Sequence, residues 1–385
     1  MAKSETKSKP KENYQYNPKR RKLAKIYSRQ KLIMSFGSGI LFPLLVICAL
    51  FFTGALENIA SWSLSFGKIL GIVIFVFVIS AIIQILEFPL YFYSNFIYEH
   101  KYSLSNQKFP AWLKDYGKET FISYLMTIPL QTITAYLIIS TKYWWLCVAG
   151  INVAFDIFTM LIYPTVILPF LYKLEPYKDK NELKVIFSIL KKVGAKDIKH
   201  IKVQKESEKS NKVNAFFAGF GKTKTIVFYD NLLNGFTKRE VRTVIAHELG
   251  HYVHKDIDRT IIFDAIKSVL VFFLADRIIR NSFAVEIIPL HLVPIISAIL
   301  IVIGVTIMPI SMAYSRKLEN AADKFALDTV KDPLAQISTE KRLSDHDLVD
   351  ERPNKFIEFW FYSHPCTEER IRRVKVWMEE NKIKG

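Results

Sequence analysis

The sequence has few cysteines, and their positions argue against a disulfide framework. It contains three in 385 residues, namely Cys48, Cys147 and Cys366. The first two lie inside apolar runs and the third stands alone near the C-terminus, so neither a set of disulfides nor a cysteine-rich metal site is indicated. Acidic residues are also scarce. Against 53 Lys and Arg there are 36 Asp and Glu, which leaves a formal net charge of +17.

This excess of positive charge fits two classes of protein. A nucleic-acid binder needs a basic face on a folded soluble domain, whereas a membrane protein carries basic loops that lie against anionic lipid. The basic residues here concentrate between long apolar runs. The sequence therefore favours a membrane protein, with the lipid bilayer as a partner and no nucleic acid.

The first 31 residues have little apolar character and are longer than the charged region of a signal peptide. We therefore expect residues 1–31 to form a mobile, solvated basic arm. Each of the runs that follow is long enough to cross roughly 30 Å of hydrocarbon as a helix. Residues 32–172 are thus predicted to be a four-span membrane region, with spans within Leu32–Leu56, Ile69–Leu86, Phe121–Ser140 and Tyr143–Tyr172.

The composition changes at residue 173. Residues 173–260 are rich in charge and should form a lobe containing one strand, Thr225–Tyr229. Residues 261–311 should provide two further spans. Residues 312–385 should form a polar helical region that supplies the last residues of the functional site. The predicted fold class is an all-α polytopic membrane protein, a multi-span helical bundle or chamber whose mainly helical lobe contains a small β-element.

The charged residues also predict an orientation. The arm, the loop 97–118, the lobe and the C-terminal region are all basic, and positive loops prefer the cytosol, so we expect the lobe to be cytosolic. Three charged residues interrupt the apolar runs, namely Asp156, Asp264 and Lys267. Because charges facing lipid are costly, these side chains should face the bundle interior or a water-filled cavity.

The stretch His247-Glu248-Leu249-Gly250-His251 carries the clearest chemical signal. Thr237-x-x-Glu240 has the spacing of a capping box and predicts a helix from Thr237 to about Asp256. Histidines four residues apart share one helix face and can bind one metal ion, and Glu248 is placed to accept a proton from water. The alternative from another class is a transporter or receptor with structural zinc, which would more often have four ligands and would leave Glu248 without a role.

A third ligand has to come from elsewhere in the sequence. His254 does not fit the longer three-histidine spacing, so we expect it to be an exposed polar residue. Glu319 and Asp323 lie four apart just beyond the last apolar run. One carboxylate can ligate the metal while the other orients a ligating imidazole. The alternative is an ordinary acidic pair on a solvated helix face.

These motifs together resemble the membrane zinc peptidases that include the type I CAAX prenyl proteases. The resemblance begins with His247–His251 followed by Ser315-Arg316-x-x-Glu319-x-x-x-Asp323. Asn214-Ala215-x-x-x-Gly219 is similar to that family's substrate-binding edge, and His364-Pro365-x-x-x-x-Arg370-Ile371 to its C-terminal element. The resemblance extends over about residues 90–375.

The resemblance implies a role for each matching position. One zinc ion would be held by His247, His251 and Glu319, and Asp323 would orient a ligating imidazole. Glu248 would be the general base of catalysis, and His364 would stabilise the oxyanion. Arg370 would help to position His364 or the substrate. The substrate would bind at Asn214, Ala215 and Gly219.

The resemblance also implies a substrate and a location. A CAAX protease removes the last three residues of a prenylated protein, whereas a quality-control relative degrades damaged membrane proteins. The four spans before the metal-binding helix favour the first branch. The membrane would be the endoplasmic reticulum in a eukaryote or the cytoplasmic membrane in a prokaryote. The sequence does not indicate an oligomeric state.

Overall fold

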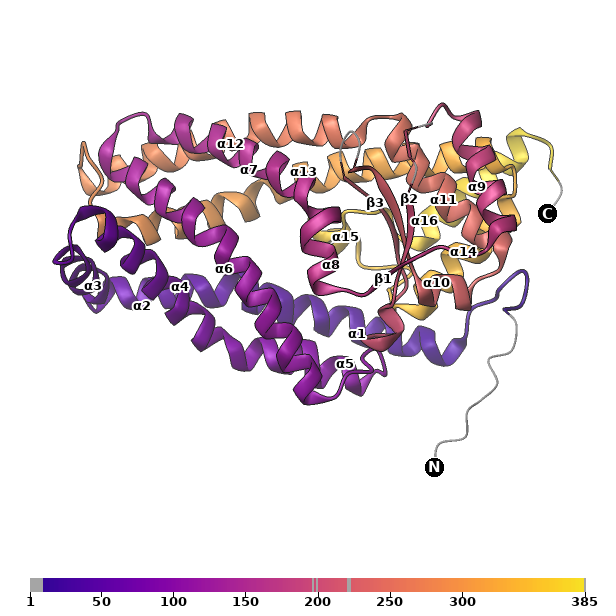
Figure 1. The fold of residues 1–385 in the computed structure, drawn as a ribbon, viewed down its shortest axis with the longest axis horizontal. Helices are drawn as coiled ribbons and strands as arrows, with labels where there is room; N and C mark the ends of the chain where they lie inside the picture. The colour runs from indigo at the N-terminus through magenta and orange to yellow at the C-terminus, as the bar shows by residue number, and fades with distance from the viewer. Residues whose placement is uncertain (1–9, 196, 199, 220–222, 384–385) are drawn as a thin grey trace.

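The computed structural model describes residues 10–195, 197–198, 200–219 and 223–383. Long helices run side by side along most of the length of the molecule, and a lobe with a small sheet occupies one end (Figure 1). The N-terminal helix reaches this same end, so the start of the chain lies beside the lobe. This arrangement agrees with the predicted fold class, a helical membrane protein with a small β-element.

The first half of the chain is almost entirely helical, and short π-helical segments (η1 to η3) join some helices end to end. Its elements are α1 (Pro18–Phe36), η1 (Gly37–Leu41), α2 (Phe42–Phe52), α3 (Ala55–Leu64), α4 (Lys68–Phe92), η2 (Tyr93–Ile97), α5 (Tyr98–Lys101), α6 (Phe109–Ser140), α7 (Trp144–Ile162), η3 (Tyr163–Ile167) and α8 (Leu168–Leu171).

The second half contains the sheet, two further long helices and a helical C-terminal region. Its elements are β1 (Leu174–Pro176), α9 (Lys180–Lys192), β2 (His200–Gln204), the 3₁₀ turn η4 (Glu206–Glu208), β3 (Ala215–Ala218), β4 (Thr225–Tyr229), α10 (Asp230–Gly235), α11 (Lys238–Val253), α12 (Asp256–Phe283), the 3₁₀ turn η6 (Leu290–Leu292), α13 (Val293–Val330), α14 (Pro333–His346), α15 (Lys355–Phe361) and α16 (Thr367–Glu380).

Among the described residues, five helices are long and apolar enough to cross a membrane: Pro18–Phe52, Lys68–Lys101, Phe109–Ser140, Trp144–Leu171 and Leu290–Val330. Of the two spans that the sequence predicted within residues 261–311, the first was at Ile261–Ala275. That segment lies within α12, which packs along α7 and α13. Asp264, Lys267 and Asp276 interrupt its apolar sequence, so α12 does not qualify as a span on length and composition.

The sheet places an edge strand beside the helix that carries the His-Glu motif. Its strand order is β1-β2-β4-β3, with β2 parallel to β4 and β3 antiparallel to β4. The strand predicted at Thr225–Tyr229 is β4. The lobe core joins this sheet to α11 through buried side chains such as Phe228, Ile245 and Leu249. Strand β3 packs on α11. No other strand of the described sheet pairs with its outer edge.

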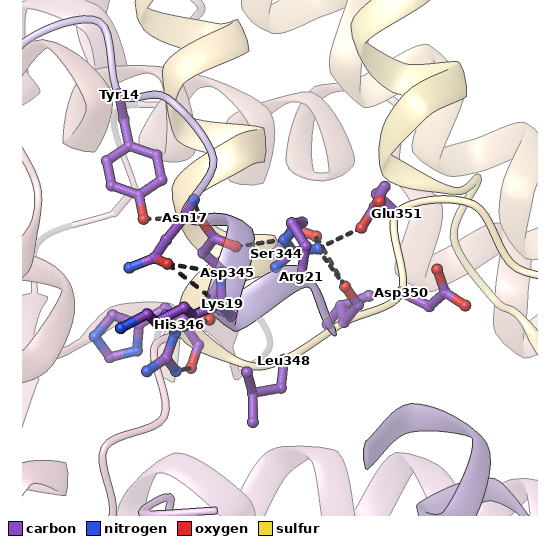
Figure 2. A network of polar contacts seen from close by, with 12 residues as sticks. Tyr14, Asn17, Lys19, Arg21, Ser344, Asp345, His346, Leu348, Asp350 and Glu351 are labelled. Atoms are coloured by element: carbon purple, nitrogen blue, oxygen red, sulfur yellow. Dashed lines mark hydrogen bonds and ion pairs between the residues drawn. The ribbon is translucent and has the colours of Figure 1, made fainter. Parts of the chain in front are cut away.

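The N-terminal segment is not the mobile arm that the sequence predicted. Arg21, on α1, is buried and forms ion pairs with Asp345 and Glu351 (Figure 2). Tyr14 donates from its backbone N–H to Ser338 Oγ at 2.7 Å. The sequence could not reveal these contacts, because their partners lie more than 300 residues away. The first nine residues of the predicted arm lie outside the described residues.

Helices α11 and α13 approach each other closely at Gly250. A Cβ built on Gly250 would lie 2.8 Å from Ala322 Cα and 3.2 Å from Ala322 Cβ. Since Ala322 is fully buried on α13, the backbone has no room to yield without separating the two helices. The glycine of the motif therefore permits the helix contact that brings the histidines of α11 toward α13.

We expect Gly250→Ala to destabilise the protein by about 1–3 kcal/mol, the usual cost of overpacking a filled core. The measurement is the thermal unfolding midpoint of the purified protein in detergent. Gly117→Ala is the matched control, because a Cβ on this α6 glycine meets no atom within 4 Å. Equal midpoints for the two variants would show that α11 and α13 are not held this tightly.

Candidate metal centre

Helix α11 presents two imidazoles to one point. The predicted capping box is present, with the Thr237 side chain accepting from Glu240 N–H and the Glu240 side chain accepting from Thr237 N–H. This cap fixes the start of the helix, and His247 and His251 follow on one face. Their Nε2 atoms lie 3.2 Å apart. The predicted helix start and shared face are confirmed, whereas the helix ends at Val253 and not at about Asp256.

Helix α13 adds a carboxylate to the pair. The Nε2 atom of His247 lies 3.3 Å from Glu319 Oε2, and that of His251 lies 3.5 Å from Glu319 Oε1. Ligand atoms held 2.0–2.1 Å from a tetrahedral ion are about 3.3–3.4 Å apart. In addition, Glu319 Oε2 is buried and accepts no hydrogen bond from the described residues. The spacing, the donor types and this unsatisfied oxygen fit a divalent cation such as zinc.

Each imidazole is oriented by a further carboxylate. His247 Nδ1 lies 2.9 Å from Asp323 Oδ1, and His251 Nδ1 lies 2.9 Å from Asp256 Oδ2. Such partners fix which ring nitrogen faces the metal and make it a better ligand. Burial by itself lowers the pKa of His247, but the neighbouring carboxylates of Asp323 and Glu319 outweigh this effect and raise the pKa to about 10. The same negative surroundings that favour a proton on this ring favour a bound cation.

Glu248 lies beside these donors without belonging to the ligand cluster. The cluster of the described residues consists of His247, His251 and Glu319. Burial raises the pKa of Glu248, with the neighbouring histidines offsetting part of the effect. A carboxylate with a raised pKa is better matched to accepting a proton near neutral pH.

The residues predicted to contact the substrate line two cavities that meet at Glu248. One cavity, of about 510 Å³, is lined by Asn214, Ala215, His364 and Arg370, together with His247 and Glu248. The exposed His364 places Nε2 3.2 Å from Glu319 Oε1, so this ring reaches the ligand cluster. Gly219 lines the other cavity and follows the edge strand β3. The structure thus brings every predicted site residue to the α11 helix or to one of these cavities.

The second cavity extends from the ligand cluster into the membrane-spanning region. Its volume is about 850 Å³, and its lining includes Glu248 and Glu319 as well as Val153 and Met160 of α7 and Ile261 of α12. Asp156 and Asp264 also line it, and Lys267 pairs with Asp264. This agrees with the expectation that the charged residues of the apolar runs face a cavity.

Sequence reasoning missed two carboxylates and misplaced one histidine. Asp256 follows the motif after a helix break at Lys255, whose φ of 54° separates α11 from α12, so its contact with His251 depends on that break. Glu340 pairs with Arg370 from α14, and no sequence signal links the two. His254, expected to be exposed, is instead half-buried, with its ring against Phe325.

A family model decides what this arrangement is. The model described as peptidase family M48 matches residues 179–378, just over half of the chain and all of the ligand cluster. The chain belongs to peptidase family M48. A second model, described as the CAAX prenyl protease N-terminal region with five membrane helices, matches residues 2–173. The M48 assignment makes this protein a membrane metallopeptidase.

The relatives of this M48 peptidase come from bacteria and eukaryotes. The Bacillus subtilis protein named uncharacterized metalloprotease YhfN is 27% identical over 93% of this chain and 86% of its own length. CAAX prenyl protease 1 of Saccharomyces cerevisiae is 29% identical over 54% of this chain and 46% of its own length. The Mus musculus homologue of that enzyme is 23% identical over 91% of this chain and 85% of its own length.

A solved structure has the same fold. The crystal structure of S. mikatae Ste24p superposes with a TM-score of 0.80, covering 96% of this chain and 92% of that one at 23% identity. The agreement covers the membrane helices as well as the lobe. It supports the whole architecture on which the two cavities depend.

Proposed function

We propose that this M48 peptidase is a zinc endopeptidase that removes the last three residues of prenylated CAAX proteins. The observation that carries the proposal is the second cavity. It connects the ligand cluster with apolar side chains of α7 and α12, where a lipid attached near the scissile bond would be shielded from water. Similarity to several proteins named CAAX prenyl protease 1 supports the same substrate class.

The residues of the site divide the work of hydrolysis. Zinc held by His247, His251 and Glu319 would supply Lewis acidity, which activates water and polarises the scissile carbonyl. Glu248 takes the proton of the attacking water and later delivers it to the leaving amine. His364 donates a hydrogen bond to the developing oxyanion. Its Nε2 lies close to the proposed ligand Glu319, and the oxyanion would form at this place.

The edge strand β3 would hold the substrate backbone. Asn214 and Ala215 line the cavity that contains His247 and Glu248, and Gly219 lines the neighbouring cavity. A peptide lying along this edge would extend across the ligand cluster from one cavity to the other. Pairing with an unpaired sheet edge provides main-chain hydrogen bonds that do not depend on side-chain identity. Arg370 donates to Asp323, which in turn contacts His247. Arg370 would therefore help to hold this histidine in position.

We further propose that the lobe faces the cytosol. The structure gathers the start of α1, the loop before α6 and the C-terminal helices at the lobe end of the molecule (Figure 1). These are the basic segments of the sequence, and basic loops are retained on the cytosolic side. The membrane would be that of the endoplasmic reticulum in a eukaryote or the cytoplasmic membrane in a prokaryote.

The test compares a farnesylated CAAX peptide with its unprenylated twin, using protein purified in detergent. We expect zinc-dependent release of the terminal tripeptide, with a higher kcat/KM for the farnesylated peptide. Met160→Trp, which narrows the second cavity, should lower that value, while Phe158→Trp on the same helix but outside the cavity lining should not. Cleavage of an unfolded membrane protein with the farnesylated peptide left intact would instead favour the quality-control function.

A further inference from the structure

Glu340 is a buried carboxylate outside the cluster that would bind the metal. It lies on α14 with 5% of its surface exposed, and its Oε2 is 2.9 Å from Arg370 Nη1. Burial raises the pKa of Glu340, although the charge of Arg370 lowers it. An ion pair removed from water is costly to form, so its presence beside a metal site calls for a reason other than stability.

Arg370 connects Glu340 to one of the histidines. Its Nε donates to Asp323 Oδ2 at 2.8 Å, and its Nη2 donates to Asp323 Oδ1. Asp323 Oδ1 in turn lies 2.9 Å from Nδ1 of His247. The guanidinium is therefore shared between two carboxylates, and only one of them touches the imidazole.

This sharing controls how strongly Asp323 acts on His247. If Arg370 were paired with Asp323 alone, its full charge would neutralise that carboxylate and weaken it as a hydrogen-bond acceptor. Glu340 takes part of the charge, which leaves Asp323 more basic toward the imidazole. A stronger acceptor at Nδ1 makes the opposite nitrogen a better metal ligand.

The helix that carries Glu340 is bonded to two other segments of the chain. Toward α11, Ser338 Oγ donates to Glu240 Oε1 at 2.6 Å, and Arg342 Nε donates to the same oxygen at 3.1 Å. The N-terminal segment also contacts α14, since Tyr14 donates from its backbone N–H to Ser338 Oγ. The side chains of Tyr14 and Arg21 both donate to the carboxylate of Asp345 (Figure 2). With α14 held in this way, Glu340 has a fixed position relative to Arg370.

We propose that Glu340 is a positioning residue that strengthens metal binding at His247 through Arg370 and Asp323. The inference rests on the proposed zinc site but not on the choice of substrate. It makes α14, which supplies none of the proposed ligands, part of the machinery that sets metal affinity. It also gives a role to a carboxylate that the proposed mechanism leaves unused.

The test is zinc affinity, measured on the purified full-length protein by competition with a fluorescent chelator. We expect Glu340→Gln to weaken zinc binding about 10-fold. This is the lower end of the effect seen when residues that support metal ligands are replaced. Glu206→Gln is the matched control, because Glu206 is another buried carboxylate, which accepts hydrogen bonds from Gln204 and Ser210 away from the site. The control should bind zinc as the unaltered protein does.

The connection through Asp323 provides a second readout. In an Asp323→Asn background, Glu340→Gln should change zinc affinity less than about twofold, since the acceptor through which it acts is already lost. An equal loss in both backgrounds would overturn the proposal, as would an unchanged affinity in the unaltered background. Should Glu340→Gln fail to fold, Glu340→Asp retains the charge and should bind zinc more tightly than Glu340→Ala. If the unaltered protein binds no zinc, the proposed function fails as well.

Discussion

Replacing Glu248 by glutamine is expected to lower peptide hydrolysis about 10²- to 10⁴-fold, the usual contribution of a general base. Glutamine has nearly the shape of glutamate but cannot accept the proton of the attacking water. Glu248 lies where the two cavities meet and is not one of the three clustered donors. The zinc content of the Glu248→Gln protein should therefore equal that of the unaltered protein. The measurement pairs kcat with bound metal in the same preparation.

The two readouts separate three explanations of the site. Loss of turnover with full metal content identifies Glu248 as the base. A parallel loss of turnover and metal would make Glu248 a structural support of the ligands rather than a participant in the chemistry. Unchanged hydrolysis by the Glu248→Gln protein would show that the measured cleavage does not arise at this site.

Local spacing explains why the centre of the site could be predicted from the sequence. The capping box at Thr237 and the four-residue spacing of His247 and His251 both act within one helix. The same holds for Glu319 and Asp323, which lie one turn apart on α13 and both contact His247. Helix geometry alone places such pairs on one face, whatever the rest of the fold does.

The outer parts of the site depend on contacts that no local pattern encodes. Glu340 reaches Arg370 only because α14 packs on α16, and Asp256 reaches His251 only because the helix breaks at Lys255. The N-terminal segment reads as a charged tail, yet Arg21 is buried against Asp345. In each case a charged residue is placed by a partner distant in sequence or by a turn, which composition and periodicity do not report.

The membrane helices show the same division. Uniform apolar runs identified α4, α6 and the span in α13 directly, because their length and hydropathy suffice. Helix α12 carries charges that face the second cavity or pair with one another, so its sequence resembles neither a clean span nor a soluble helix. The predicted boundary at residue 311 falls within α13, which continues unbroken from the apolar segment to Glu319 and beyond. A single continuous helix thus joins the membrane region to the ligand cluster.

Glu319→Gln should weaken zinc binding by more than roughly 100-fold, because it removes a proposed ligand. Replacing a residue that only supports a ligand has an effect of at most about that size. Zinc bound to the folded state stabilises it by mass action, so a chelator should lower the thermal midpoint of the unaltered protein. The midpoint of the Glu319→Gln protein should be insensitive to the chelator. Asp328→Asn is the matched control, since this carboxylate lies on the same helix and bonds to Trp377 Nε1 instead.

A Glu319→Gln protein that kept full affinity would show that the third ligand is a different side chain. His364 is then the candidate, because its Nε2 lies 3.2 Å from Glu319 Oε1, at the edge of the ligand cluster. In that case His364→Ala would abolish zinc binding. If Glu319 is the ligand, His364→Ala should instead retain zinc and lose turnover, as expected for a residue that donates to the oxyanion. The two substitutions together therefore decide which side chain completes the metal site and which one acts on the substrate.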